Sequence, residues 1–150
     1  MCTEEKILKS SKVVAIVGLS SKRRRPSYGV GLYLKKHGYK VIPVNPREET
    51  ILGERSYASL SMISEPVDVV DIFRRPEEVL EVVDEAIKIG AKAVWMQEEV
   101  VNEAAAARAR GAGLEVVMDK CMKKEHQRMS GEEPLPPGVC ELPKDDELQP

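Results

Sequence analysis

The chain has 150 residues, enough for one domain whose hydrophobic core needs no metal or disulfide to hold it. Charged residues make up 32% of the chain and aromatic residues only 4%, so aliphatic side chains must fill that core. The net charge of -2 argues against a general nucleic-acid-binding surface, and the two histidines are too few to suggest a histidine-based metal site.

The charge is unevenly distributed. Residues 131–150 hold six acids against one lysine, together with five of the ten prolines, which leaves residues 1–130 with a net charge of +3. We expect one folded domain over residues 1–130, followed by an acidic, proline-rich and mobile tail.

The cysteine pattern and hydropathy bear on location. Three cysteines without paired or metal-ligand spacing are typical of a reducing compartment, so we expect a cytoplasmic protein. No run approaches the roughly 18 apolar residues of a membrane span, and we expect no membrane association. Many lysines and glutamates beside few amides are typical of a heat-tolerant source.

Short apolar runs alternate with amphipathic segments along the chain. We expect helices over residues 3–10, 27–37, 76–89, 98–110 and 122–129. We expect strands over residues 13–17, 39–44, 67–73, 93–96 and 114–118. Residues 51–64 predict only a short extended piece and a helical turn. This alternation predicts an open parallel sheet with helices on both faces, with any ligand at the carboxyl ends of the strands.

A glycine ends the first expected strand, and a cationic loop follows it. Residues 18–25 read Gly-Leu-Ser-Ser-Lys-Arg-Arg-Arg and lead to a helix at Pro26-Ser27. Backbone N–H groups and the positive helix end converge there. We therefore expect a phosphate site, with Ser20 and Ser21 as donors and Lys22 plus one or two arginines as counter-charges. The second glycine of a G-x-G-x-x-G fingerprint is missing. The alternative is an ordinary basic loop in water.

The second expected strand ends at Asn45-Pro46-Arg47. A site for an unphosphorylated ribose usually has an acid there to accept from the ribose hydroxyls. A neutral amide and a cation, unopposed by acids, would instead accommodate a phosphorylated ribose, as in coenzyme A or NADP. The alternative is that Asn45-Pro46 forms a common turn.

Three further strand ends carry candidate binding residues. Phe73-Arg74 could stack on an adenine base, the alternative being a core position for Phe73. Trp95-Met96-Gln97 offers apolar area and an amide, with a core position again the alternative for Trp95. Cys121 could face a ligand thiol or be a small buried hydrophobe. The charged run 123–128, which includes His126, is interpreted as a solvated helix face.

Five of these motifs, in this order, resemble the small stand-alone CoA-binding proteins. They are Gly18-Leu-Ser20 with its cationic loop, Val44–Arg47, Asp71–Arg74, Val94–Gln97 and Cys121–His126, and the similarity covers about residues 5–130. The resemblance implies a Rossmann-like α/β fold, an open and mainly parallel sheet of five to six strands, similar to the N-terminal CoA-binding domain of the succinyl-CoA synthetase α subunit. It implies CoA across the strand ends, and binding rather than ligase activity.

Carried over by position, the pyrophosphate would meet Gly18, Ser20 and Ser21, and the phosphorylated ribose would lie beside Asn45-Pro46-Arg47. The full set of candidate CoA-binding residues is Gly18, Leu19, Ser20, Ser21, Lys22, Arg24, Arg25, Ser27, Asn45, Pro46, Arg47, Phe73, Arg74, Trp95, Met96, Gln97 and Cys121.

We therefore expect a protein that binds coenzyme A or an acyl-CoA without catalysis of its own, and that forms a homo-oligomer or joins a partner enzyme. Two alternatives stay open. One is an NADP-dependent oxidoreductase, which the missing glycine fingerprint disfavours. The other is a Rossmann-like interaction subunit of a larger acyl-CoA enzyme.

Overall fold

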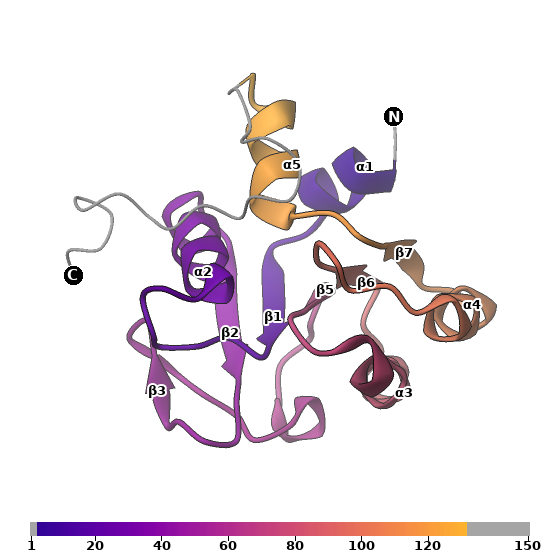
Figure 1. Cartoon of the computed structure of the whole chain (residues 1–150), viewed down its shortest axis with the longest axis horizontal. Helices are drawn as coiled ribbons and strands as arrows, with labels where there is room; N and C mark the ends of the chain where they lie inside the picture. Colours follow the sequence, from indigo (N-terminus) through magenta and orange to yellow (C-terminus); the bar gives the residue numbers. More distant parts are fainter. Residues whose placement is uncertain (1–2, 132–150) are drawn as a thin grey trace.

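A five-stranded parallel sheet is the centre of the molecule (Figure 1). The computed structural model describes residues 3–131. The strands lie in the order β2-β1-β5-β6-β7, with bounds β1 Val13–Val17, β2 Lys40–Val44, β5 Val69–Ile72, β6 Ala93–Met96 and β7 Glu115–Val117. Every pairing in this sheet is parallel, which confirms the predicted Rossmann-like α/β class. The predicted tail lies outside the described residues, apart from Gly131.

Helices cover both faces of the sheet (Figure 1). Their bounds are α1 Thr3–Ser10, α2 Pro26–Lys36, α3 Val79–Lys88, α4 Glu103–Gly111 and α5 Met122–Met129, with short 3₁₀ helices η1 Leu60–Met62 and η2 Pro76–Glu78. Helices α3 and α4 pack on one face, and α1, α2 and α5 pack on the other. No helix within residues 3–131 is long and apolar enough to cross a bilayer.

Several predicted boundaries shift for identifiable reasons. The helix predicted over 98–110 begins only at Glu103, because the Asn102 side chain accepts a hydrogen bond from the Ala105 N–H at 2.9 Å and caps it. Pro76 opens η2, and α3 follows at Val79. Residues 51–64 include part of an antiparallel hairpin, β3 Thr50–Ile51 and β4 Glu54–Arg55, followed by η1.

The strand order places a topological switch point at β1. From β1 the chain moves to β2 on one side and then returns to β5 on the other side. The register puts Val17 between Val44 of β2 and Ile72 of β5. The helices that follow β1 and β5, which are α2 and α3, cover opposite faces of the sheet. Ligands of open α/β sheets bind outside the carboxyl ends of the strands at such a point.

Candidate functional site

Gly18 lies where the carboxyl ends of β1, β2 and β5 meet, here called the Gly18 junction. Its N–H donates to the Val44 carbonyl at 2.9 Å, and the Phe73 N–H donates to the Val17 carbonyl at 2.9 Å. Gly18 has a φ of +88°, and a Cβ atom there would clash with the Phe73 carbonyl oxygen. Glycine alone permits both this conformation and this close approach. Glycine at position 18 therefore allows the carboxyl ends of β1, β2 and β5 to meet at one point.

The loop from Leu19 to Arg25 is anchored at its base and exposed at its tip. Leu19 is buried and packs toward Gly31 of α2. The Ser20 N–H donates to the Ser27 hydroxyl at 3.1 Å, and the Ser20 hydroxyl accepts from the Lys22 N–H at 3.0 Å. Ser20 and Ser27, both predicted ligand contacts, thus shape the loop itself.

The cationic side chains of this loop project into solvent. Lys22, Arg23, Arg24 and Arg25 are all exposed. Within residues 3–131 none of the four forms an ion pair. Adjacent like charges repel one another, so a ligand anion at the loop would relieve this repulsion.

Asn45 joins the loops that follow β1 and β2. Its Nδ2 donates to the Leu19 carbonyl at 3.0 Å, and its Oδ1 accepts from the Arg47 N–H at 2.9 Å. Pro46 and Arg47 are exposed beside it. The amide predicted to lie beside a ribose phosphate therefore holds both loops in place, and it carries Arg47 to the edge of the Gly18 junction.

Carboxylates also lie at this edge, so the expectation that its cations are unopposed by acids is wrong. Glu48 follows Arg47 and reaches back to the loop after β1. Its Oε2 accepts from the Ser21 N–H at 3.2 Å, and its Oε1 accepts from the Ser21 hydroxyl. Nothing in the sequence around Glu48 indicates this contact, and only the folded loop shows that its side chain turns back toward Ser21.

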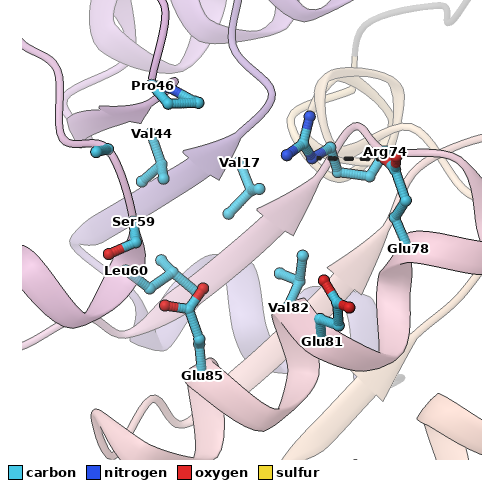
Figure 2. Close-up of a pocket in the computed structure, with 11 residues that line it drawn as sticks. Val17, Val44, Pro46, Ser59, Leu60, Arg74, Glu78, Glu81, Val82 and Glu85 are labelled. Carbon is cyan, nitrogen blue, oxygen red and sulfur yellow. Dashed lines mark ion pairs between the residues drawn. The ribbon is translucent and has the colours of Figure 1, made fainter.

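A cavity of about 150 Å³ opens beside the Gly18 junction, on the α3 face of the sheet (Figure 2). Its lining comes from the ends of β1 and β2, the segment at η1, and the η2–α3 segment: Val17, Val44, Pro46, Ala58, Ser59, Leu60, Arg74, Glu78, Glu81, Val82 and Glu85. Sites that enclose a whole drug-sized ligand measure about 300–1,000 Å³. This cavity is smaller, so it has room for one group of a larger ligand.

The cavity combines apolar and charged walls. Figure 2 shows Val17, Val44 and Val82 among its apolar side chains, and an ion pair of 3.8 Å joins Arg74 Nε to Glu78 Oε2. Arg74 was predicted as a site residue, whereas the lining glutamates were missed. Glu78, Glu81 and Glu85 recur at spacings of three and four residues, a helical period that the sequence already displays.

Trp95 and Met96 do not line one crevice, which corrects the prediction. Both are fully buried, Trp95 in the core under α1, α2 and α5 and Met96 in the core under α3 and α4. Successive strand residues point to opposite faces, so the two cannot contact a ligand from the same side. The Trp95 Nε1–H donates to the Lys120 carbonyl at 2.9 Å. Phe73 is half-buried against the same core as Trp95.

Asp71, Gln97 and Cys121 form a buried polar cluster near the ends of β5, β6 and β7. Their exposed fractions are 0%, 2% and 3%. Gln97 Nε2 donates to Asp71 Oδ1, while Asp71 Oδ2 and Gln97 Oε1 have no hydrogen-bond partner within the described residues. Asp71 and Gln97 are 26 residues apart in the chain, and only the pairing of β5 with β6 brings them together.

Burial raises the pKa of the Asp71 carboxyl well above its usual value of 3.8. The hydrogen bond from Gln97 acts in the opposite direction, and the Cys121 thiol adds to the increase. The predicted exposure of Cys121 to a ligand is not seen, because its thiol lies inside this cluster. Of the predicted site residues, those at the ends of β1, β2 and β5 come together, and those at β6 and β7 lie in the interior.

Comparison with known proteins identifies the family. A family model described as a CoA binding domain matches residues 12–127. The uncharacterized protein YneT of Bacillus subtilis (strain 168) is 38% identical over 122 residues, which cover 81% of this chain and 90% of that protein. A solved structure of a hypothetical protein from Pyrococcus horikoshii OT3 is 41% identical with a TM-score of 0.84, over 87% of this chain and 94% of that one.

A further similarity is to part of a much longer enzyme. The ADP-forming acetate–CoA ligase of Methanocaldococcus jannaschii is 30% identical over 89 residues, which make up 59% of this chain but only 13% of that enzyme. The matched family region includes the Gly18 junction, the cationic loop and the cavity lining. With most of its length matched by that model, and with a parallel sheet whose strand ends meet at Gly18, the chain belongs to the CoA-binding domain family.

Proposed function

We propose that the protein binds coenzyme A or an acyl-CoA at the carboxyl ends of β1, β2 and β5. The observation that carries this proposal is the set of exposed cations around the Gly18 junction. Lys22, Arg23–Arg25 and Arg47 have no ion-pair partner anywhere in residues 3–131, and the cavity at the same sheet edge is lined by Pro46, which directly precedes Arg47. A phosphorylated adenosine offers the complementary charge together with one flat ring for the cavity.

The charges of the cavity decide which end of the ligand enters it. Glu78, Glu81 and Glu85 would repel a phosphate, whereas a carboxylate can accept a hydrogen bond from the exocyclic amine of adenine. Val17, Val44 and Val82 offer apolar surface to the ring. We therefore place the adenine in the cavity and the phosphates over the loop after β1, with Arg47 beside the ribose phosphate.

The remaining part of the ligand would run toward β5 and β6. We place the pantetheine arm past Phe73 toward Gln97, whose residual exposure of 2% leaves little open surface in this structure. A mixed disulfide with Cys121 would form by attack of its thiolate on CoA disulfide, with one CoA thiolate leaving, and would require that the start of α5 opens first. The proposal is one of binding without catalysis. The hydrogen bond between His126 and the Tyr33 hydroxyl, 2.7 Å long and within the α2–α5 packing, supports a structural role for that histidine. The cysteine pattern supports a cytoplasmic location.

Calorimetric titration with CoA, dephospho-CoA and NADP tests the proposal. We expect CoA to bind most tightly, dephospho-CoA to bind about 1.5–3 kcal/mol more weakly because charged hydrogen bonds to the ribose phosphate are lost, and NADP to give no heat. Tight NADP binding with hydride transfer would favour the oxidoreductase instead, and no heat with any of the three ligands would refute the proposal.

The same titration locates the site on the protein. Arg47→Ala and Arg24→Ala should each weaken CoA binding by about 1–3 kcal/mol. Arg110→Ala removes an equally exposed arginine from the last turn of α4, where no role in binding is assigned, and should leave the affinity unchanged. Equal losses in all three variants would show that only the overall charge matters.

A further inference from the structure

Three hydrogen-bond donors at the Gly18 junction already hold an anion, and that anion is the protein's own. The donors are the Ser21 N–H, the Ser21 hydroxyl and the Asn45 Nδ2, here called the Ser21–Asn45 donor cluster. The Glu48 carboxylate accepts from all three, at 3.2 Å from the Ser21 nitrogen and 3.4 Å from Asn45 Nδ2. These groups come from the two loops that follow β1 and β2.

A backbone N–H, a hydroxyl and a side-chain amide, with lysine and arginine nearby, are the donors that a phosphate oxygen uses in proteins. Lys22 follows Ser21 directly, and Arg47 precedes Glu48 directly. A carboxylate and a phosphate cannot occupy the same donors, because their like charges repel at contact distance. The ligand and Glu48 therefore compete for the cluster.

We propose that Glu48 is a specificity-determining residue, a built-in competitor that only a phosphate group displaces from the Ser21–Asn45 donor cluster. This inference rests on the proposed function and names the residue that controls the affinity of the site for a phosphate group. Glu48 is half-buried in the loop after β2, so its side chain can swing toward solvent without disturbing the core. A dianionic phosphate gains more than a monoanionic carboxylate from Lys22 and Arg47, whereas an uncharged hydroxyl gains less and leaves Glu48 in place.

The test compares Glu48→Gln with Glu49→Gln in calorimetric titrations with CoA. Both substitutions remove one negative charge from adjacent positions. Glu49 is exposed, and its side chain makes no hydrogen bond or ion pair within the described part of the chain. Glu48→Gln should bind CoA roughly tenfold more tightly than the wild-type protein, because a neutral amide competes less well for the donors. The CoA affinity of Glu49→Gln should differ from that of wild type by less than about twofold at 0.15 M salt. Salt screens an exposed charge that makes no direct contact with the ligand.

Thermal unfolding of the wild-type protein and Glu48→Gln, with and without CoA, is an independent test. Without ligand, Glu48→Gln should unfold at a lower temperature than wild type, because it loses the charged link between the two loops. With saturating CoA it should unfold at the same or a higher temperature. A purely structural Glu48 would lower both temperatures alike, and that result would overturn the inference.

The two proposals fail in different ways. If wild type and Glu49→Gln bind CoA while Glu48→Gln binds with equal or lower affinity, Glu48 is not a competitor, and the proposed function stands. An equal gain in both variants also overturns the inference, because it reduces the effect to net charge. If none of the three proteins binds CoA, both proposals are refuted.

Discussion

Asp71 is a fully buried acid in the middle of a parallel sheet, and its chemistry follows from that position. Burial raises the pKa of its carboxyl, so the folded state favours the protonated form. A neutral Asp71 carries an O–H donor, which suits a site where the Asp71 Oδ2 and Gln97 Oε1 lack partners within the described residues. Asp71 therefore contributes a neutral hydrogen-bonding group at pH values where an exposed aspartate is ionised.

The raised pKa of Asp71 predicts how the free energy of unfolding depends on pH. The unfolded chain ionises Asp71 near pH 3.8, and the folded chain does so only at a higher pH. Between these values the unfolded state binds fewer protons, so the free energy of unfolding falls as pH rises, by about 1.4 kcal/mol for each unit of difference in pKa. Asp71→Asn cannot ionise and should lose less stability over the same range, as measured by denaturant unfolding between pH 3 and 8.

Asp84→Asn is the matched control for this experiment. Asp84 pairs at the surface with Arg108 at 2.9 Å, and exposed pairs contribute about 0–1 kcal/mol. Its pH profile should therefore stay close to that of the wild-type protein. Parallel profiles for wild type and Asp71→Asn would show that Asp71 is ionised in the folded state.

Single residues also show where sequence reasoning succeeds and where it stops. The importance of Gly18 was predictable, because a glycine that ends a strand just before a cationic loop and a helix is typical of an anion-binding turn. The burial of Trp95 agrees with the alternative given for it, a core position, and not with its place in the candidate binding set. The contact between Glu48 and Ser21 could not be predicted, because it depends on the path of a loop that contains no periodic pattern.

Helix α5 packs against the rest of the protein in a way that its own sequence does not indicate. The run 123–128 predicts a solvated helix face, and this interpretation is wrong. Lys123, Lys124 and His126 are buried. Lys124 pairs with Glu98 at 3.0 Å, and Lys123 lies 5.6 Å above the ring of Tyr33. The partners come from α2 and from the loop after β6, so nothing within the run indicates them.

The β3–β4 hairpin escaped prediction for a different reason. Its turn residues Leu52 and Gly53 have φ values of 54° and 77°. Two-residue hairpin turns favour positive φ, but asparagine or aspartate usually provides it at the first position. Because leucine stands at that position, the sequence lacks the pattern that usually predicts such a turn. Boundaries set by tertiary contacts were likewise missed, whereas the long helices and the buried strands followed from their periodicity.

Helix α4 has a cap whose contribution can be measured. The Asn102 Oδ1 accepts from the Ala105 N–H at 2.9 Å, and its Nδ2 donates to the Pro76 carbonyl at 2.9 Å, which ties α4 to η2. Asn102→Ala should lower the free energy of unfolding by about 1–2 kcal/mol. Asn102→Ser keeps the capping oxygen but cannot reach Pro76, so it should recover about half of that loss. Equal stability of all three proteins in urea would contradict this account of the cap.

At the scale of the whole molecule, the alternation of strands and helices was enough to predict the fold, because each parallel strand needs a crossover connection. The order of the strands was not predictable, and the site depends on it. The order β2-β1-β5 brings Gly18, Asn45 and Arg74 to one edge of the sheet, where the cavity opens. The same order places Trp95 and Cys121 in the interior.

The central claim is that the phosphates of coenzyme A bind over the loop after β1, with the adenine in the adjoining cavity. A crystal structure of the protein grown with CoA tests it most directly. The account predicts the base between Val17 and Val82, a phosphate oxygen within hydrogen-bond distance of the Ser21 N–H, and Glu48 turned away from Ser21. CoA bound elsewhere, with Glu48 still on Ser21 and the cavity empty, would contradict it.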